Sequence, residues 1–311
     1  MTASWRWILV ATIAPIAWGS TYVVTSQLLP AESPLWGAAL RALPAGLVLL
    51  LLARRRPRGS WWWRSAVLGT LNVGAFFVLV YLAAQLLPSG IAAMLMAIAP
   101  AVMLLLAWPL AAERPALLSL AGAAVGFAGV VVLLAGASGT VDLWGVAASL
   151  AAMLMSSVGF VLARRWNDGT PALALTAWQL TGGGLALVVA ALLAEGLPPA
   201  LDSAELIGFA YLTLIATALA YVTWFAALQH LTAGAVGLIG LLNPVTGVVL
   251  GVIVVGEQFT GAQVAGMVIV VAGIVLGQPA LTELAARLRA RRSRSQSTPD
   301  ECPPESGLLP T

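Results

Sequence analysis

One arginine lies within a long apolar stretch of this sequence. Arg41 is the only ionised side chain well inside an apolar stretch of this chain, about 10 Å along a helix from Pro34. At that depth a charge must face a partner or a wet cavity. It can pair with a carboxylate on a substrate. It can equally bind backbone carbonyls at a broken helix or pack near a gate, and no acidic residue at similar depth decides between these interpretations.

Two glutamates occupy matching places near the ends of apolar stretches. Glu113 and Glu257 each precede a last, glycine-containing stretch. A membrane carboxylate can couple transport to protons, whereas a charge at the interface is inexpensive and can simply end a helix. We favour the structural role for both and keep coupling as the alternative.

Neutral polar and aromatic side chains near mid-depth are the remaining candidates for a binding cavity. A mid-depth aromatic is not an interface anchor, because the aromatic belt lies at the headgroups, although each residue alone could serve packing only. Pro244 predicts a helix break, since proline frees a carbonyl of its own helix, and Pro100 is its counterpart. The predicted cavity wall comprises Trp18, Ser20, Thr21, Tyr22, Asn72, Ser157, Trp178, Gln179, Tyr221, Trp224 and Asn243, together with Arg41.

Several kinds of chemistry are excluded by residues that the chain lacks. All basic residues are arginine, so no Walker-type phosphate loop with its lysine exists. His230 is the only histidine and Cys302 the only cysteine, which rules out a Ser-His-Asp triad, a His/Cys metal cluster and a disulfide framework. We therefore expect no enzyme activity, no cofactor and no metal.

Composition makes this a polytopic membrane protein. The 311 residues are 60% hydrophobic and only 9% charged, and mean hydropathy is +0.97, whereas soluble domains are about 25% charged. A span needs roughly 20 apolar residues. Ten such stretches fit, and we predict spans at 7–28, 34–53, 65–86, 91–110, 117–136, 142–164, 171–193, 203–229, 233–255 and 260–279.

The charges between these spans predict the orientation. Every arginine except Arg41 falls in alternate loops or in the two termini, while the other loops carry only acidic residues. By the positive-inside rule both termini are cytoplasmic, and a bacterial inner membrane is the expected location. The pI near 9.6 therefore indicates membrane lipid and not nucleic acid as the partner of the basic groups. Residues 280–311, basic and then Pro/Glu-rich, are typical of a disordered cytoplasmic tail.

The second half of the chain repeats the first. Placing 81–131 on 225–275 aligns scarce residues, including both prolines and both glutamates named above. Five spans per copy, an odd number, invert one copy relative to the other, as in secondary transporters. The predicted fold is an all-α integral membrane protein with two inverted five-helix repeats, 7–136 and 142–279.

Short local runs resemble the drug/metabolite transporter superfamily, and specifically its EamA-like ten-span members. The runs are AWGSTY at 17–22, LRA at 40–42, AER at 112–114 and GEQ at 256–258. The resemblance covers 7–279 and implies an inner-membrane carrier that moves small metabolites or drugs, usually outward, through a cavity between the halves. Substrate identity does not follow from it.

The leading functional hypothesis is a secondary exporter of a small neutral, zwitterionic or weakly acidic metabolite, such as an amino acid. A multidrug exporter of lipophilic cations is the alternative, although no mid-depth carboxylate supports it. A sugar-phosphate or nucleotide-sugar antiporter is less favoured, because the last two spans hold no basic residue. Glycine pairs four residues apart predict close helix packing and leave both a monomer and a homodimer open.

Overall fold

The protein is described by a computed structural model that covers residues 4–99, 102, 105–106, 109–110, 117–135, 141–166, 168–228, 239–240 and 242–277. Every helix or strand assigned within these ranges is a helix. Predictions that concern Pro100, Glu113, His230 or the tail at 280–311 lie outside the described residues.

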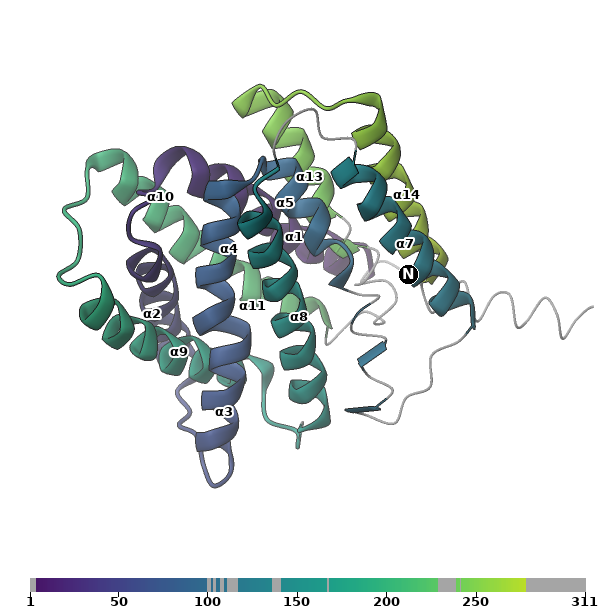
Figure 1. Ribbon diagram of the computed structural model, residues 1–311. Helices are drawn as coiled ribbons and strands as arrows, with labels where there is room; N and C mark the ends of the chain where they lie inside the picture. Colours follow the sequence, from purple (N-terminus) through teal and green to yellow (C-terminus); the bar gives the residue numbers. More distant parts are fainter. Residues whose placement is uncertain are drawn as a thin grey trace, which may run out of the picture.

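The first half of the chain forms long apolar helices joined by short loops (Figure 1). Pro34 opens the second helix in the first turn, where its missing N–H is not needed. The described elements are α1 (Ser4–Leu28), α2 (Pro34–Ala53), α3 (Trp61–Gly69), the π-helical turn η1 (Thr70–Gly74), α4 (Ala75–Leu86), α5 (Ser89–Met96) and α7 (Leu117–Ala135).

The second half has a similar order of elements. Asp202 and Glu205 form a capping box at the start of α10, with each side chain accepting from the backbone N–H of the other residue. The described elements are α8 (Leu143–Arg165), α9 (Ala172–Ala194), α10 (Ser203–Thr213), η2 (Leu214–Leu219), α11 (Ala220–Leu228), α13 (Leu242–Leu250), η3 (Gly251–Val255) and α14 (Gly261–Gly277).

Six described helices are long and apolar enough to cross a membrane, and three shorter ones are also apolar. This makes the chain a multi-pass membrane protein. The third predicted span begins earlier than expected, at Trp61 rather than at 65, where the Trp61 indole Nε1 donates to Asp168 Oδ2 at 2.8 Å. The six long spans are Arg6–Leu28, Pro34–Ala53, Trp61–Leu86, Leu143–Ala163, Ala172–Ala194 and Ser203–Trp224.

Arginine-bearing loops and acidic loops lie at opposite ends of the bundle. At the end that we name the arginine end, the Trp178 indole Nε1 donates to the carbonyl of Arg55 at 2.8 Å, beside the Trp61–Asp168 contact. At the other, acidic end, Glu195 accepts hydrogen bonds from the first backbone amides of α2. Carboxylates therefore meet helix N-termini at that end, where the helix dipole favours them.

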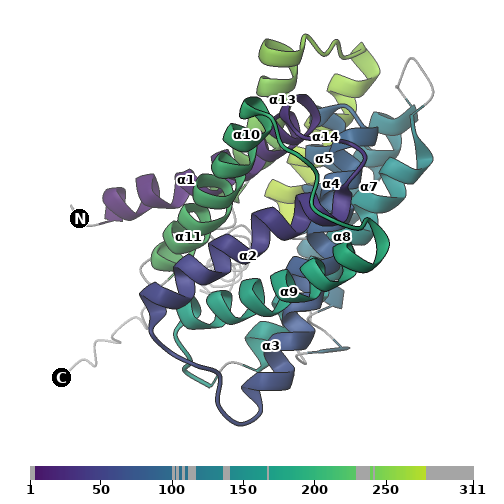
Figure 2. The ribbon, with the colours of Figure 1, turned by 90° about the vertical axis from the view of Figure 1, so that its left-hand side faces the viewer.

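Small residues allow two helix pairs from opposite halves to pack closely. Helices α2 and α9 lie side by side (Figure 2), and a Cβ on Gly46 would collide with the Thr181 nitrogen. Helices α7 and α14 form the other pair, where a Cβ on Gly273 would collide with the Gly126 nitrogen. Backbone contacts this close exclude larger side chains, as expected for glycine-mediated membrane packing.

The π-helical turns η1 and η2 occupy matching places in the two halves. They begin at Thr70 and Leu214, an offset of 214 − 70 = 144, which is also the offset that aligns Pro100 with Pro244 (244 − 100 = 144). Helix α3 starts at the arginine end, whereas α10 starts at the acidic end, where Gly208 packs on Leu28. The two interrupted helices therefore run in opposite directions (Figure 1).

Candidate functional site

Arg41 projects from α2 onto the π-helical turn η2. Its Nε donates to Thr217 Oγ1 at 2.8 Å, and its Nη2 donates to the Ala216 carbonyl at 3.3 Å. The guanidinium also lies 4.4 Å from the ring centre of Phe77 on α4, a cation–π distance. The side chain is only 7% exposed, so the bundle surrounds the charge.

The partners of Arg41 are neutral. Among the described residues they are a hydroxyl, a carbonyl and an aromatic ring, and none of these is a carboxylate. Within the described part of the chain, Nη1 makes no hydrogen bond, so the guanidinium keeps donors for another acceptor. The contact with the Ala216 carbonyl at the interrupted helix fits the structural alternative that the sequence left open. The spare donors also suit an anionic ligand, because the opposite charge would offset the desolvation of the guanidinium.

Aromatic residues from two predicted spans stand beside this arginine. The phenols of Tyr22 on α1, and of Tyr211 and Tyr221 on the eighth predicted span, lie within electrostatic reach of the guanidinium. Trp18 packs on Tyr221 at 5.6 Å and on Trp224 at 5.2 Å between ring centres. The structure thus brings five predicted wall residues into one region: Trp18, Tyr22, Arg41, Tyr221 and Trp224.

Ser20 belongs to the same region, and Thr21 follows it on α1. The Ser20 hydroxyl lies 2.6 Å from the Tyr211 hydroxyl and also donates to the Ala17 carbonyl. The Thr21 hydroxyl donates to the same carbonyl at 3.3 Å. Both side chains are buried, and Ser20 joins α1 to α10.

A second buried polar contact lies at η1. Asn72 Nδ2 donates to Gln179 Oε1 on α9 at 2.9 Å, while Asn72 Oδ1 is buried without a hydrogen-bond partner within the described part of the chain. Gly159 on α8 makes room for this amide, because a Cβ there would overlap Asn72 Oδ1. The two predicted residues Asn72 and Gln179 are therefore brought to each other.

The remaining predicted wall residues lie elsewhere. Ser157 is fully buried and its hydroxyl donates within its own helix, to the Met153 carbonyl at 2.7 Å. Trp178 lies at the arginine end, 6.0 Å from Trp61 between ring centres. Asn243 lies where α1 crosses α13, with its carbonyl at the place that a Cβ on Gly19 would occupy. The structure does not join these three to Arg41.

The described helix α13 passes through Pro244, which is buried in its first turn. Glu257 accepts from the Ser89 amide at 2.6 Å and from the Gly90 amide at 3.1 Å. These are the first amides of α5, so this carboxylate of the second half caps a helix of the first half.

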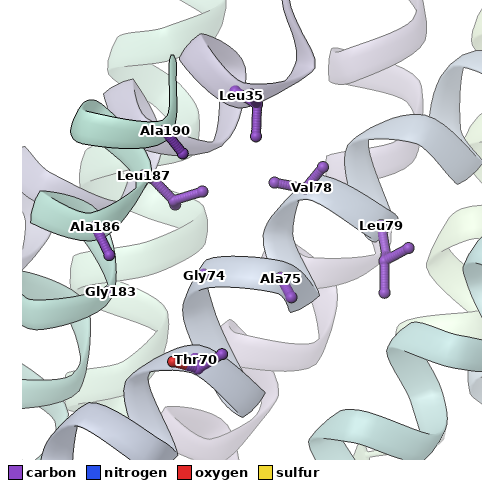
Figure 3. Close-up of a pocket in the computed structure, with 10 residues that line it drawn as sticks. All are labelled: Leu35, Thr70, Gly74, Ala75, Val78, Leu79, Gly183, Ala186, Leu187 and Ala190. Carbon is purple, nitrogen blue, oxygen red and sulfur yellow. The ribbon is translucent and has the colours of Figure 1, made fainter. Parts of the chain in front are cut away.

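An open groove on the side of the bundle is a different kind of surface (Figure 3). It offers about 380 Å³ between α9 and the η1–α4 segment. Thr70 is its one polar side chain, and that hydroxyl already donates to the Ala66 carbonyl. The groove suits hydrocarbon and has no group to orient a charged ligand. Its lining is Leu35, Thr70, Gly74, Ala75, Val78, Leu79, Gly183, Ala186, Leu187 and Ala190.

Sequence reasoning missed Thr217, Phe77 and Tyr211. A π-helical turn has no sequence signature, so nothing in the run around Thr217 placed its hydroxyl opposite Arg41. Phe77 is one of many apolar residues in its span. Tyr211 had a usable signal, because the chain has only four tyrosines and three of them lie within electrostatic reach of the arginine.

Comparisons with known proteins agree with the helical membrane architecture. The EamA-like transporter family model matches the chain twice, over 5–135 and 143–277. Protein PecM of Dickeya dadantii (strain 3937) is 36% identical over 270 residues, 86% of this chain and 91% of that protein. A probable amino-acid metabolite efflux pump of Salmonella typhimurium is 27% identical over 278 residues, with 86% and 92% covered.

Two further likenesses concern location and fold. The uncharacterized inner membrane transporter YedA of Escherichia coli (strain K12) is 27% identical over 267 residues, 84% of this chain and 87% of that protein. A solved crystal structure superposes with a TM-score of 0.65 at 21% identity, over 88% of this chain and 97% of the other. At that identity the structural likeness speaks for the fold alone.

Proposed function

Because this chain belongs to the EamA-like transporter family and is a multi-pass membrane transporter, we propose that it exports a small neutral, zwitterionic or weakly acidic metabolite, such as an amino acid. The observation that carries this proposal is Arg41, a buried cation whose partners among the described residues are neutral and leave donors spare. A carboxylate on the substrate would complete its coordination. The aromatic rings of Trp18, Tyr221 and Trp224 would flank the rest of the molecule.

The proposed architecture is ten membrane spans in two inverted halves, 7–136 and 142–279, with both termini in the cytoplasm. The double family match, the common offset of η1 and η2 and their opposite directions support it. The separation of arginine and acidic loops to opposite ends supports the orientation. Transport would proceed by rocking the halves around a site near the midplane.

The name of one relative supports the amino-acid class, since that protein is called a probable amino-acid metabolite efflux pump. A lipophilic cation is a poorer substrate for this site. At 4 Å, two like charges repel by about 4 kcal/mol at the effective dielectric typical of protein sites, and the described wall around Arg41 offers no carboxylate to offset that repulsion.

We assign no described carboxylate a role in coupling export to a proton gradient. Glu257 already accepts two backbone amides at the N-terminus of α5, which favours a structural role for it. We propose facilitated export, driven by the substrate gradient, as the simplest mechanism for this chain.

Purified protein in proteoliposomes tests the proposal. Labelled amino acids and ethidium-type cations are offered with and without a pH gradient, beside protein-free vesicles and vesicles with Arg41→Gln. We expect the wild type to transport amino acids with little effect of the gradient, Arg41→Gln to transport them much more slowly, and protein-free vesicles to show no transport. Accumulation of the cations without transport of amino acids would reverse the assignment.

A further inference from the structure

We propose that Thr217 is a positioning residue for substrate binding, which holds the Arg41 guanidinium by its Nε edge so that Nη1 faces the substrate. This proposal rests on the proposed function, because it specifies how the same arginine meets an anionic group. Thr217 would not touch the substrate itself. It would act through Arg41, from the π-helical turn of the opposite half of the chain.

The contact between the two side chains is short and closed to water. Thr217 is fully buried and Arg41 nearly so, and Nε lies 2.8 Å from the hydroxyl oxygen. A hydrogen bond to a charged group contributes more than one between neutral groups, because the charge strengthens it. With the neighbouring Ala216 carbonyl on Nη2, the turn fixes one edge of the guanidinium plane.

The Phe77 ring covers one face of the Arg41 guanidinium, since its ring centre lies 4.4 Å from the guanidinium carbon. The Nε edge is occupied by Thr217 and one face by the ring, so a ligand can approach through Nη1 and the spare Nη2 hydrogen. This pair of donors matches the two oxygens of a carboxylate. The substrate class that fits is therefore a molecule with a terminal carboxylate.

The described residues include three π-helical turns, η1, η2 and η3, and Arg41 contacts η2. Such turns are rare, occur mostly as single bulges within α-helices, and are frequent at functional sites. They are also places where helices bend. Arg41 thus binds the eighth predicted span at its interrupted point, from a helix of the other half.

The matching turn η1 gives an internal comparison. Subtracting the offset of 144 from Ala216 gives Asn72 (216 − 144 = 72), and this residue also meets a polar side chain from the opposite half, Gln179. Both turns therefore bind a polar side chain across the halves. Of these two turns, only η2 contacts a charged side chain. Because η1 forms without an arginine, we infer that the Thr217 hydroxyl serves Arg41 and not the formation of the turn.

Transport kinetics test the positioning role. Thr217→Val removes the hydroxyl at nearly constant shape, Thr217→Ser keeps it, and Thr223→Val is the matched control. Thr223 lies on the same predicted span, and its hydroxyl donates to carbonyls of that span.

We expect Thr217→Val to raise the KM for an amino acid roughly tenfold with little change in kcat. Thr217→Ser and Thr223→Val should keep the wild-type KM. An unchanged KM for Thr217→Val, or an equal rise for Thr223→Val, would overturn the assignment.

A second measurement needs no transported substrate, and so it separates failure of this proposal from failure of the proposed function. The thermal unfolding of detergent-solubilised protein is compared for the wild type, Thr217→Val, Arg41→Gln and the double variant. If Thr217 acts through Arg41, its replacement lowers the midpoint in the wild-type background and has a much smaller effect in the Arg41→Gln background. Equal effects in both backgrounds would show that the hydroxyl does not serve the arginine, whatever the protein transports.

Discussion

The π-helical turns η1 and η2 interrupt two helices at the same offset in the halves of the chain, and they differ in what they bind. At η1 an amide meets an amide, Asn72 with Gln179. At η2 a guanidinium meets a hydroxyl and a carbonyl, Arg41 with Thr217 and Ala216. The helix interruption is common to both halves of the bundle, whereas only η2 contacts a charged side chain.

This difference distinguishes a polar contact that stabilises the structure, at η1, from one that we propose serves substrate binding, at η2. A neutral amide pair can close a buried turn at modest cost, because it carries no charge to desolvate and shares one hydrogen bond, although Asn72 Oδ1 stays without a partner among the described residues. A buried arginine costs much more to desolvate, and its partners in the described part of the chain leave it without a counter-charge. A charge kept under those conditions is best explained by a ligand that supplies the counter-charge.

The largest expected effect follows from removing the charge of Arg41, so that η2, like η1, contacts only a neutral side chain. Arg41→Gln should lower kcat/KM for an amino acid roughly a hundredfold, because it removes a desolvated partner of the substrate carboxylate. Arg41→Lys should recover only part of the rate, since it lacks the planar fork. Initial rates in proteoliposomes with matched protein content measure this. Unchanged rates for both variants would remove Arg41 from the site.

The next effect concerns the neutral turn. Gln179→Leu leaves the Asn72 amide wholly unpaired in a buried position and should lower the free energy of unfolding by about 1–3 kcal/mol. Adding Asn72→Leu should recover much of the loss, because no polar group then stays unpaired. Denaturation in detergent reports both. If Gln179→Leu instead changed the preference for a carboxylate-bearing substrate, the contrast between the two turns would fail.

The close packing of Gly159 against Asn72 at η1 can be tested by a further substitution. Gly159→Ala places a methyl group against Asn72 Oδ1 and should cost about 1–3 kcal/mol through displacement of that side chain. Gly182→Ala on α9 is the matched control, because its Cβ would meet nothing within 4 Å. The control should be neutral or slightly stabilising. Similar losses for both variants would contradict the close packing at Asn72.

The smallest effect should arise away from both turns. Glu195 accepts from the amides of Leu35 and Trp36 at 2.8 and 3.0 Å, and Glu195→Gln keeps one acceptor while losing the charge. We expect a loss of about 0.5–1 kcal/mol in unfolding free energy and the wild-type substrate preference. A changed preference would show that selectivity is not confined to the region of Arg41.

Hydropathy predicted the six long spans within a few residues, because the membrane requires about 20 apolar residues per crossing and few loops resemble that. Arg41 could be found as a candidate from its isolation, since no other charge lies well inside a span. The sequence alone gave neither its partners nor a choice between a substrate-binding and a structural role. Those partners come from η2, a local helix distortion set by packing across the bundle.

Depth along a span was a weaker guide to the site than charge. Trp178 and Gln179 are neighbours in sequence and were assigned to the same wall, yet the Trp178 indole bonds to the Arg55 carbonyl at the arginine end, while Gln179 meets Asn72. Adjacent residues of a helix face different neighbours. Position along the chain therefore did not identify the neighbours of each side chain.

The most direct test compares an N-acetylated amino acid with its N-acetylated carboxamide, in which a neutral amide replaces the carboxylate, in proteoliposomes with the wild type and with Arg41→Gln. If Arg41 receives the substrate carboxylate, the wild type prefers the acid by at least roughly tenfold in kcat/KM, and Arg41→Gln transports the two compounds almost equally. A wild type that does not distinguish them, or a variant that keeps the full preference, would contradict the account.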